Sequence, residues 1–250
     1  MKKFAAIILL FVSFVSNSQS ADELFKEGNT FYKVEDYNRA MGVYLAIEEK
    51  GIESSDLYYN LGNCYYKLNK VAPAIYYYEK ALKLDPANED ALHNLTFAKR
   101  MTLDVIEDLP KTFFQRFSEN VIQKYTFDTW ALIAVIASFL ASLLFLLYHF
   151  SGSSKMKLLY FNTTIFSVFV MLVSVFFAYD NYDTVQKNRT AIIFATKTEV
   201  KNAPTNSSEE VFELHEGTKV IILDELDNWK KIKIADGKVG WIYQDDLKEI

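Results

Sequence analysis

Residues 58–86 read YYNLGNCYYKLNKVAPAIYYYEKALKLDP, and a looser copy lies 34 positions earlier, where residues 24–52 read LFKEGNTFYKVEDYNRAMGVYLAIEEKGI. The matching positions are Leu24, Gly28, Phe31, Ala40, Tyr44 and Ile47 in the first copy and Tyr58, Gly62, Tyr65, Ala74, Tyr78 and Ala81 in the second. A period of this length is typical of paired antiparallel helices that stack, because one pair alone cannot bury its apolar face. The two copies therefore predict a helical repeat.

The second copy resembles the tetratricopeptide repeat. It carries the family motif as Tyr58-x-x-Leu61-Gly62-x-x-Tyr65, followed by Ala74, Tyr78, Ala81 and Pro86. The resemblance implies that Gly62 lets two antiparallel helices pass closely and that Ala74 lies where they cross. The first copy departs from the motif, because Glu27 takes the leucine position and Ile52 takes the position of the closing proline.

A third copy is present only in outline. Residues 89–101 retain Leu92 and Leu95 of the pattern, which predicts a capping helix rather than a full repeat. Terminal caps are needed in stacked repeats because the last apolar face would otherwise meet water. We therefore expect an all-α repeat domain over residues 21–101.

The chain begins with the features of a signal peptide. Met1, Lys2 and Lys3 give a basic start, residues 4–15 form an apolar run, and residues 18–20 include small side chains. This order predicts a signal peptide over residues 1–20 and export of the repeats. An uncleaved membrane anchor is the alternative, and it leaves the repeats on the same side of the membrane.

Two long apolar segments explain why half of the residues are hydrophobic and twenty are Phe. Residues 130–150 and 158–178 each contain 21 positions without a formal charge. At a rise of about 1.5 Å per residue, each covers roughly 31 Å, which matches a hydrocarbon core of about 30 Å. We expect two transmembrane helices rather than a helical hairpin buried in a soluble protein.

The connection between the two segments indicates their orientation. Residues 151–157 are too few for a domain and include Lys155 and Lys157 with no acidic residue. Short cytoplasmic loops carry such an excess of positive charge, so this loop is predicted to face the cytoplasm. Both globular ends then lie on the exported side, in agreement with the signal peptide.

A further apolar pattern lies between the repeats and the first span. Aromatic and aliphatic side chains recur there at helical spacing, accompanied by Lys111, Arg116 and Lys124. They are Phe113, Phe114, Phe117, Val121, Ile122 and Tyr125. The pattern predicts an amphipathic helix over residues 111–127 at the membrane interface, in contact with lipid. A helix that packs on the repeat domain is the alternative.

The last 60 residues have β character. After a charged linker at residues 180–190, short β-branched runs alternate with turns, and Asp236-Gly237 is typical of a hairpin. A small all-β barrel of five or six strands over residues 191–250 would remove free sheet edges. The segment resembles the bacterial Src-homology-3-like domain in the spacing Leu214-x-x-Gly217-x-x-Val220, Trp229-x-x-Ile232, Asp236-Gly237-x-x-Gly240-Trp241-Ile242 and Leu247.

The order of these parts resembles the BatE family of Bacteroidetes-type aerotolerance operons. The resemblance implies a multidomain protein of the bacterial inner membrane, with two spans and with periplasmic N- and C-terminal domains. It also implies a non-catalytic scaffold whose partners are membrane or periplasmic proteins, including von Willebrand factor A-domain Bat proteins. It supplies no established active site.

Charge and reactive side chains exclude several functions. Residues 21–110 carry ten basic and sixteen acidic side chains, and residues 191–250 carry eight and twelve, so neither region has the basic surface that nucleic acid requires. The single Cys64 has no disulfide partner and is expected to be buried. The three histidines lie in different predicted elements, and the sequence holds no phosphate-binding loop, so we expect no metal, no cofactor and no catalytic site.

A peptide-binding groove is the favoured functional site. In tetratricopeptide arrays the residue after the helix-crossing glycine points into the concave face, and here these residues are Asn29 and Asn63. An Asn amide both donates and accepts hydrogen bonds, so the pair could hold the backbone of an extended peptide. The predicted flanking residues are Tyr32, Tyr59, Tyr66, His93 and Arg100. The alternative is that the asparagines only bridge adjacent helices. Phe25 replaces the lysine of the carboxylate-clamp subfamily, which argues against recognition of a C-terminal carboxylate in that way.

The predicted barrel offers a second set of candidates. Trp229 and Tyr243 could contact a ligand, whereas Trp241 follows Gly240 in a core strand and is expected to be structural. A protein-contact module is favoured over a domain that binds cell-wall peptide. The sequence therefore predicts a scaffold that binds partner proteins, and the alternative is a peptidoglycan-associated anchor of the cell envelope.

Overall fold

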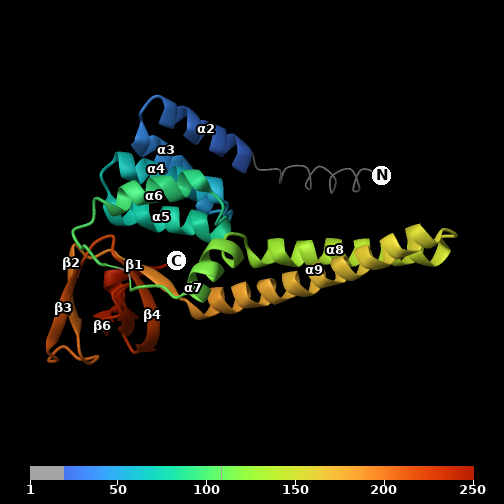
Figure 1. The fold of residues 1–250 in the computed structure, drawn as a ribbon. Helices are drawn as coiled ribbons and strands as arrows, with labels where there is room; N and C mark the ends of the chain where they lie inside the picture. Colours follow the sequence, from blue (N-terminus) through green and yellow to red (C-terminus); the bar gives the residue numbers. More distant parts are fainter. Residues whose placement is uncertain (1–19, 108) are drawn as a thin grey trace, which may run out of the picture. The chain divides into compact units, whose positions relative to one another are not determined.

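The structure is a computed structural model, and it describes residues 20–107 and 109–250 (Figure 1). The chain divides into two compact units at Glu53 and Ser54, and each unit is described by itself. The predicted signal peptide, apart from Ser20, lies outside the described residues.

The first unit is the helix pair α2 (Ala21–Lys33) and α3 (Tyr37–Glu48). Ser20 and Glu23 form a reciprocal capping box at the start of α2, which satisfies two backbone donors that the helix leaves open. Asp36 caps α3 by accepting from the Arg39 amide at 3.2 Å. The side chains buried between the helices are Leu24, Ala40, Tyr44 and Ile47.

The second unit begins with the helices α4 (Ser55–Lys67), α5 (Val71–Leu84) and α6 (Glu89–Lys99). Ser54 caps α4 and Asn88 caps α6, and these caps separate three helices that the apolar pattern alone would not delimit. The helices bury a continuous core that includes Leu57, Leu61, Ala74, Ile75, Tyr78, Ala81, Ala91, Leu95 and Ala98. The predicted second repeat and its capping helix are therefore present.

The glycine of each repeat lies against a tyrosine of the following helix. A Cβ added at Gly62 would come within 2.6 Å of the Tyr78 ring, and one added at Gly28 within 2.5 Å of the Tyr44 ring. Real Cβ atoms do not approach other atoms this closely. The glycines are thus required by the distance between the paired helices, as the tetratricopeptide motif implies.

We predict opposite effects for two glycine substitutions in helices. Gly62→Ala should lower stability by about 1–3 kcal/mol, because the new methyl group overpacks against Tyr78. Gly42→Ala should raise it by up to about 1 kcal/mol, because no atom lies within 4 Å of its Cβ position and alanine is the better helix former. Thermal melting of the two full-length variants checks the signs, and a stabilising Gly62→Ala would mean that the helices are not in close contact.

The segment before the first span is less regular than predicted. In place of one amphipathic helix over residues 111–127, the structure has the short helix α7 (Phe113–Phe117) and a π-helical turn, η1 (Ser118–Ile122). The backbone then leaves the helical conformation, and Thr126 caps a new helix by accepting from the Thr129 amide at 3.2 Å. This segment contacts the helical hairpin, because the rings of Phe117 and Phe177 lie with their centroids 6.2 Å apart.

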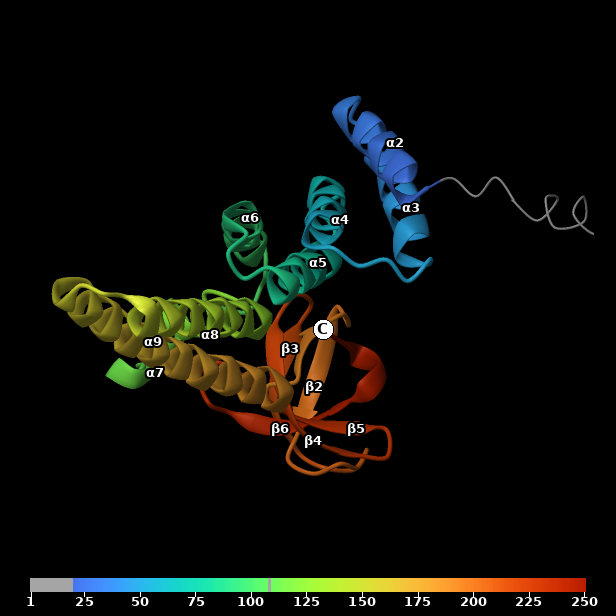
Figure 2. The same cartoon turned by 90° about the vertical axis from the view of Figure 1, so that its right-hand side faces the viewer.

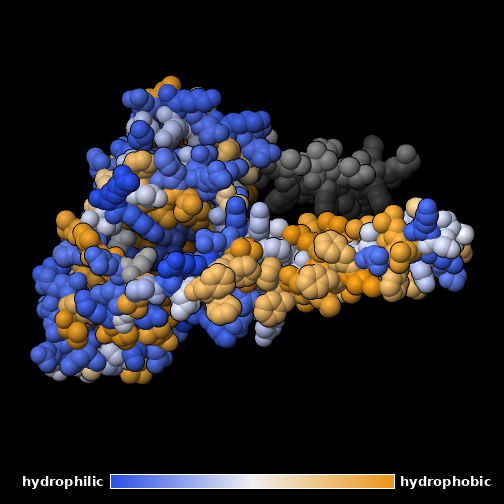
Figure 3. All heavy atoms as spheres, viewed as in Figure 1, coloured by the Kyte–Doolittle hydropathy of each residue, from blue (hydrophilic) through white to orange (hydrophobic). Residues whose placement is uncertain are grey.

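Two long helices, α8 (Phe127–Phe150) and α9 (Ser154–Lys187), lie antiparallel and form a hairpin (Figures 1 and 2). Both are long and apolar enough to cross a membrane. Small side chains line their contact, where Ser167 Oγ donates to the Ala137 carbonyl at 2.8 Å and Ala134, Ala141 and Ser174 are buried. Hydrophobic residues cover most of the outer surface of the hairpin that Figure 3 displays, and hydrophilic residues gather at its tip.

The hairpin differs from the predicted spans at its ends. The predicted loop at 151–157 is shorter, because α9 already begins at Ser154. The predicted linker at 180–190 is wrong, because α9 continues through Asp180 to Lys187, where Lys187 and Asp183 form an ion pair at 2.7 Å. An acid and a base four positions apart lie on one helix face and favour the helix. At about 1.5 Å per residue, the 34 residues of α9 extend roughly 51 Å, well beyond a hydrocarbon core.

The C-terminal region is an antiparallel sheet that wraps around one core (Figure 2). It has seven short strands rather than five or six, in the order β3-β2-β6-β5-β4-β1-β7. They are β1 (Thr190–Ile193), β2 (Lys197–Lys201), β3 (Glu210–His215), β4 (Lys219–Leu226), β5 (Trp229–Lys233), β6 (Val239–Tyr243) and β7 (Leu247–Glu249). The core includes Ile193, Val200, Leu214, Val220, Ile222, Ile232, Ile242 and Leu247. The predicted β5–β6 hairpin turns at Gly237, whose φ of 92° suits glycine.

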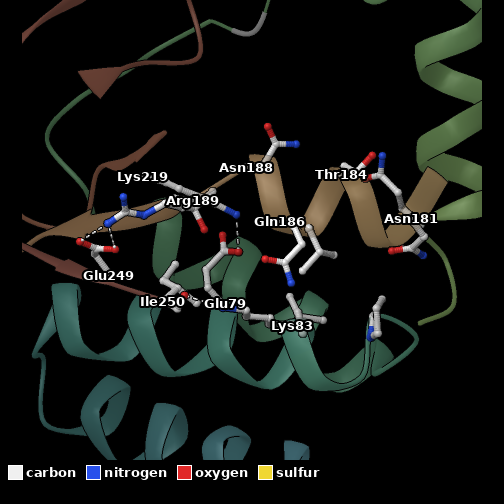
Figure 4. A pocket seen from close by; sticks show the side chains of 15 residues that line it. Glu79, Lys83, Asn181, Thr184, Gln186, Asn188, Arg189, Lys219, Glu249 and Ile250 are labelled. Atoms are coloured by element: carbon white, nitrogen blue, oxygen red, sulfur yellow. Dashed lines mark hydrogen bonds and ion pairs between the residues drawn. The ribbon is translucent and has the colours of Figure 1, made fainter. Parts of the chain in front are cut away.

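A buried carboxylate joins this barrel to the repeat. Glu79 of α5 lies 2.6 Å from Lys219 of β4, as Figure 4 shows. It also lies 3.0 Å from Lys99 of α6. Burial alone would raise the pKa of Glu79, but the charges of Lys219 and Lys99, and their hydrogen bonds, hold it below its ordinary value. The carboxylate is therefore ionised and shared between two elements that are far apart in the sequence.

A second carboxylate, in the segment after α6, forms hydrogen bonds to the same barrel. Asp104 accepts hydrogen bonds from the His215 amide at 2.7 Å, from His215 Nδ1 at 2.7 Å and from Thr218 Oγ1 at 2.6 Å. Burial opposes its ionisation, yet the hydrogen bonds from Thr218 and His215 keep the pKa of Asp104 below its usual range. Gly217, with φ of 88°, lets this turn approach Val71 and Ile75 of α5.

Candidate peptide-binding site

Each repeat contains the same bridge between its asparagine and its buried tyrosine. The Tyr44 hydroxyl donates to Asn29 Oδ1 at 2.6 Å, and the Tyr78 hydroxyl donates to Asn63 Oδ1 at 2.7 Å. In the second unit, Asn94 Nδ2 donates to the same Asn63 oxygen at 2.8 Å. The asparagines therefore do bridge adjacent helices, which is the structural role that the sequence left open.

The bridge also fixes how the Asn63 amide is oriented. Its oxygen is occupied by two donors, whereas among the described residues no acceptor pairs with its Nδ2 group. The side chain is 8% exposed, and Nδ2 is not one of the enclosed polar atoms of the described residues that lack a partner. The Asn63 Nδ2 group thus keeps two N–H donors for a further acceptor, and the bonds from Tyr78 and Asn94 fix the orientation of the amide.

Tyr59 and Asn94 complete this part of the surface. Asn94 Nδ2 lies 3.3 Å from the Tyr59 hydroxyl, and the Tyr59 ring is half-buried, 6.2 Å from the ring of Tyr78. Asn94 is not among the predicted groove residues, because it does not occupy the repeat position of Asn63, where the third copy has Phe97. It lies one turn earlier on α6. Its sequence signal is the repeat period, because Asn94 lies 34 positions after Asn60.

The remaining predicted groove residues fall into separate places. Tyr66 is half-buried at the end of α4. His93 is exposed on α6, and Arg100 is exposed directly after the helix. Both contact Phe97: the His93 ring lies 4.8 Å away between centroids, and the Arg100 guanidinium lies 5.1 Å from the Phe97 centroid. Tyr32 belongs to the first unit and packs edge-on against Tyr37 at 5.2 Å. Within the second unit, the structure brings together Tyr59 and Asn63 and adds Asn94.

The two barrel candidates are neighbours across adjacent strands. Trp229 of β5 pairs with Tyr243 of β6, and their rings meet edge-on at 5.4 Å. Asn228 Nδ2 donates to the Tyr243 hydroxyl at 3.3 Å, and the exposed Leu226 pairs with Trp229. Trp241 is half-buried on the face opposite the core residue Ile242, because successive strand residues point to opposite faces.

The single thiol and the potential metal ligands are the remaining reactive groups of the described residues. Cys64 is buried, and this burial raises the pKa of its thiol to about 12, so the thiolate nucleophile is scarce at neutral pH. Residues 20–107 and 109–250 contain no cluster of three or more His, Cys, Asp or Glu side chains that could hold a metal ion. The surfaces around Asn63 and Trp229 provide hydrogen-bonding groups and aromatic rings for contact.

Comparison with known proteins identifies the two modules. Residues 55–88 match the model of the tetratricopeptide repeat, and residues 196–248 match the model of the bacterial SH3 domain. Both kinds of module are typically non-catalytic and serve protein interaction, and the bacterial SH3 domain also points to peptidoglycan. No curated protein matches the chain.

Several solved structures of tetratricopeptide proteins are similar to parts of the chain. The first such domain of Spaghetti (RPAP3), bound to an HSP90 peptide, is 24% identical over 35% of this chain and 70% of that one, with a TM-score of 0.32. The Sgt2 domain from Aspergillus fumigatus is 13% identical over 68% and 83%, with a TM-score of 0.31. YrrB, described as having an unusual peptide-binding site, is 16% identical over 67% and 76%, with a TM-score of 0.32. The repeat assignment rests on the chain's own motif and on the family model.

Proposed function

We propose that this protein is a non-catalytic scaffold of the bacterial inner membrane that binds partner proteins through its repeats and its barrel. The α8–α9 hairpin spans the membrane twice, and the lysines of its tip, Lys155 and Lys157, face the cytoplasm. The repeats and the barrel then share the periplasmic side. The resemblance to the BatE family supports a place in a Bat complex, with von Willebrand factor A-domain proteins among the partners.

The observation that carries the proposal is the orientation of the Asn63 amide. Its oxygen accepts from Tyr78 and Asn94, which leaves its two N–H donors for another acceptor, and Asn94 also donates to the hydroxyl of the half-buried Tyr59. Such donors suit the carbonyl oxygens of an extended peptide, and an adjacent tyrosine supplies apolar area with a hydroxyl. The partner recognised by this surface is therefore a peptide segment held mainly by its backbone.

We predict that Asn63→Asp weakens partner binding without unfolding the repeat. Aspartate keeps the oxygen that accepts from Tyr78 and Asn94 but loses the N–H donors. Two lost hydrogen bonds of about 0.5–1.5 kcal/mol each correspond to a loss of affinity of about fivefold to a hundredfold. Crosslinking and recovery of partners from native membranes measures the effect.

The hydrogen bond from Tyr78 to Asn63 decides which substitution and which control are suitable. Asn63→Ala is unsuitable, because it would leave the buried Tyr78 hydroxyl without its acceptor at a cost of about 1–3 kcal/mol. Asn38→Asp makes the same chemical change at an exposed position of α3 and should leave partner recovery unchanged. Full recovery with a folded Asn63→Asp variant would show that this surface does not bind the partner.

A second candidate function is a peptidoglycan-associated anchor, and the Trp229–Tyr243 pair favours it. Paired aromatic rings beside the exposed Leu226 form an apolar surface with a polar edge, suited to a sugar or peptide of the cell wall. Co-sedimentation of the full-length protein with purified sacculi, before and after Trp229→Ala, separates this function from protein binding.

A further inference from the structure

The short helix α7 exposes aromatic side chains that no other described element covers. Phe113 is 76% exposed and Phe114 is 80% exposed, and their rings meet edge-on at 5.7 Å. Transfer of such a ring from water to an apolar medium is favourable, so two adjacent exposed rings indicate a contact outside the described fold.

The turn after α7 is fastened to the helical hairpin. Asn181 of α9 is buried, and its Nδ2 donates to the carbonyl oxygens of Tyr125 at 2.6 Å and Ile122 at 3.1 Å. Trp130 Nε1 of α8 donates to the same Ile122 oxygen at 2.9 Å. These bonds satisfy carbonyl groups that the irregular turn leaves unpaired. Such pairing is required where water is scarce, as at the edge of a bilayer.

The same contacts set the level of α7 along the hairpin. The Phe177 ring lies 6.2 Å from that of Phe117 on α7 and 5.0 Å from that of Trp130. Phe177 is near the end of the uncharged stretch of α9, which ends at Tyr179, directly before Asp180. Tryptophan is enriched at this level of membrane proteins. The hairpin thus holds α7 beside the periplasmic boundary of the predicted span, as Figure 1 shows for α7 and α9.

The charges near α7 suit lipid headgroups. Lys111 forms an ion pair with Glu119 at 2.8 Å. Arg116 and Lys124 are exposed, and among the described residues neither has a carboxylate partner. The two cations without a carboxylate partner suit the phosphates of lipid headgroups, and the two exposed aromatic rings suit the acyl chains beneath them.

We propose that α7 is an interfacial anchor whose Phe113 and Phe114 insert into the acyl chains of the periplasmic leaflet, while Arg116 and Lys124 meet lipid phosphate. The inference rests on the proposal that α8 and α9 span the membrane. The occupant of this surface is the lipid bilayer rather than a protein. The anchor would fix the depth of the hairpin and hold the repeat and the barrel close to the membrane surface.

Nitroxide labels on the full-length protein test the anchor. The labels are placed one at a time by Phe113→Cys, Phe114→Cys, Phe169→Cys and Glu89→Cys, and the protein is reconstituted in vesicles of phosphatidylethanolamine and phosphatidylglycerol. The native Cys64 stays in place, because it is buried and does not react with the reagent. Phe169 is exposed in the middle of α9, and Glu89 is exposed on α6 in the repeat. Collision rates with oxygen, which enters lipid, and with a water-soluble nickel complex are compared.

The outcomes test the anchor and the membrane spans separately. The anchor predicts that labels at 113, 114 and 169 collide mainly with oxygen and that the label at 89 collides mainly with nickel. Oxygen contact at 169 with nickel contact at 113 and 114 overturns the anchor and leaves the spans intact. Labels at 113 and 114 shielded from both reagents would mean that a protein covers α7, which also overturns it. Nickel contact at 169 contradicts the spans, and with them the proposed scaffold of the inner membrane.

Discussion

Tyr78→Ala is expected to open the second repeat, with a loss of about 3–5 kcal/mol of stability. Tyr78 is fully buried, and its ring fills the space that Gly62 leaves between α4 and α5. Removing the ring creates a cavity that the paired helices cannot close. It also removes the Tyr78 hydroxyl, which is one of the two groups that donate a hydrogen bond to Asn63 Oδ1. Both the packing of the repeat and the orientation of the proposed peptide-binding amide depend on this one side chain.

Hydrogen exchange on the full-length protein measures this effect locally. The amides of α4 and α5 should open at least about a hundredfold more often in Tyr78→Ala, since each 1.4 kcal/mol corresponds to a factor of ten. Tyr78→Phe is the matched control. It keeps the ring and removes only the hydroxyl, so it should cost about 1 kcal/mol. If Tyr78→Ala exchanged no faster than Tyr78→Phe, the ring would not hold the repeat together.

The sequence was sufficient where a feature depends on residues close together in the chain. The second repeat follows from the spacing of Gly62, Ala74 and Tyr78, and the structure confirms its helices. The β5–β6 hairpin follows from Asp236-Gly237, because a turn with positive φ needs glycine. The apolar segments stand out through their length, although the sequence placed the end of α9 too early by reading its acidic and basic residues as a linker.

Features that depend on distant contacts were not visible in the sequence. Nothing near Asn94 in the chain shows that it bonds to Asn63, 31 positions away. The irregular turn before α8 depends on Asn181, which lies more than fifty positions further on. Glu79 is the clearest case. In the sequence it is one acidic residue on a helix, and only the fold shows that two lysines from other elements surround it.

The Glu79 contact leads to the second large effect, which concerns the junction of the repeat and the barrel. Lys219→Met should lower stability by about 2–3 kcal/mol, because it leaves a buried carboxylate with only one cation. Breaking a fully buried ion pair costs about 3–5 kcal/mol, and the remaining Lys99 reduces this penalty. Urea unfolding of the full-length protein measures the change. The exposed pair of Lys197 and Glu213 supplies the control, since Lys197→Met should cost no more than about 1 kcal/mol.

The pH dependence of the same variant tests whether the charge of Glu79 is the cause. A carboxyl group with a lowered pKa in the folded state stabilises the protein above its unfolded pKa of about 4.3, and this stabilisation disappears as the pH falls through the folded value. Lys219→Met should raise the pKa of Glu79, so that its carboxyl group takes up a proton at a higher pH in the folded variant than in the folded native protein. The stability penalty of the variant should therefore shrink as the pH falls. The double variant Glu79→Gln with Lys219→Met removes the uncompensated charge and should recover part of the loss near neutral pH. A Lys219→Met penalty that stays constant from about pH 7 to pH 4, with no recovery in the double variant, would mean that the lysine stem rather than its charge holds the barrel against α5.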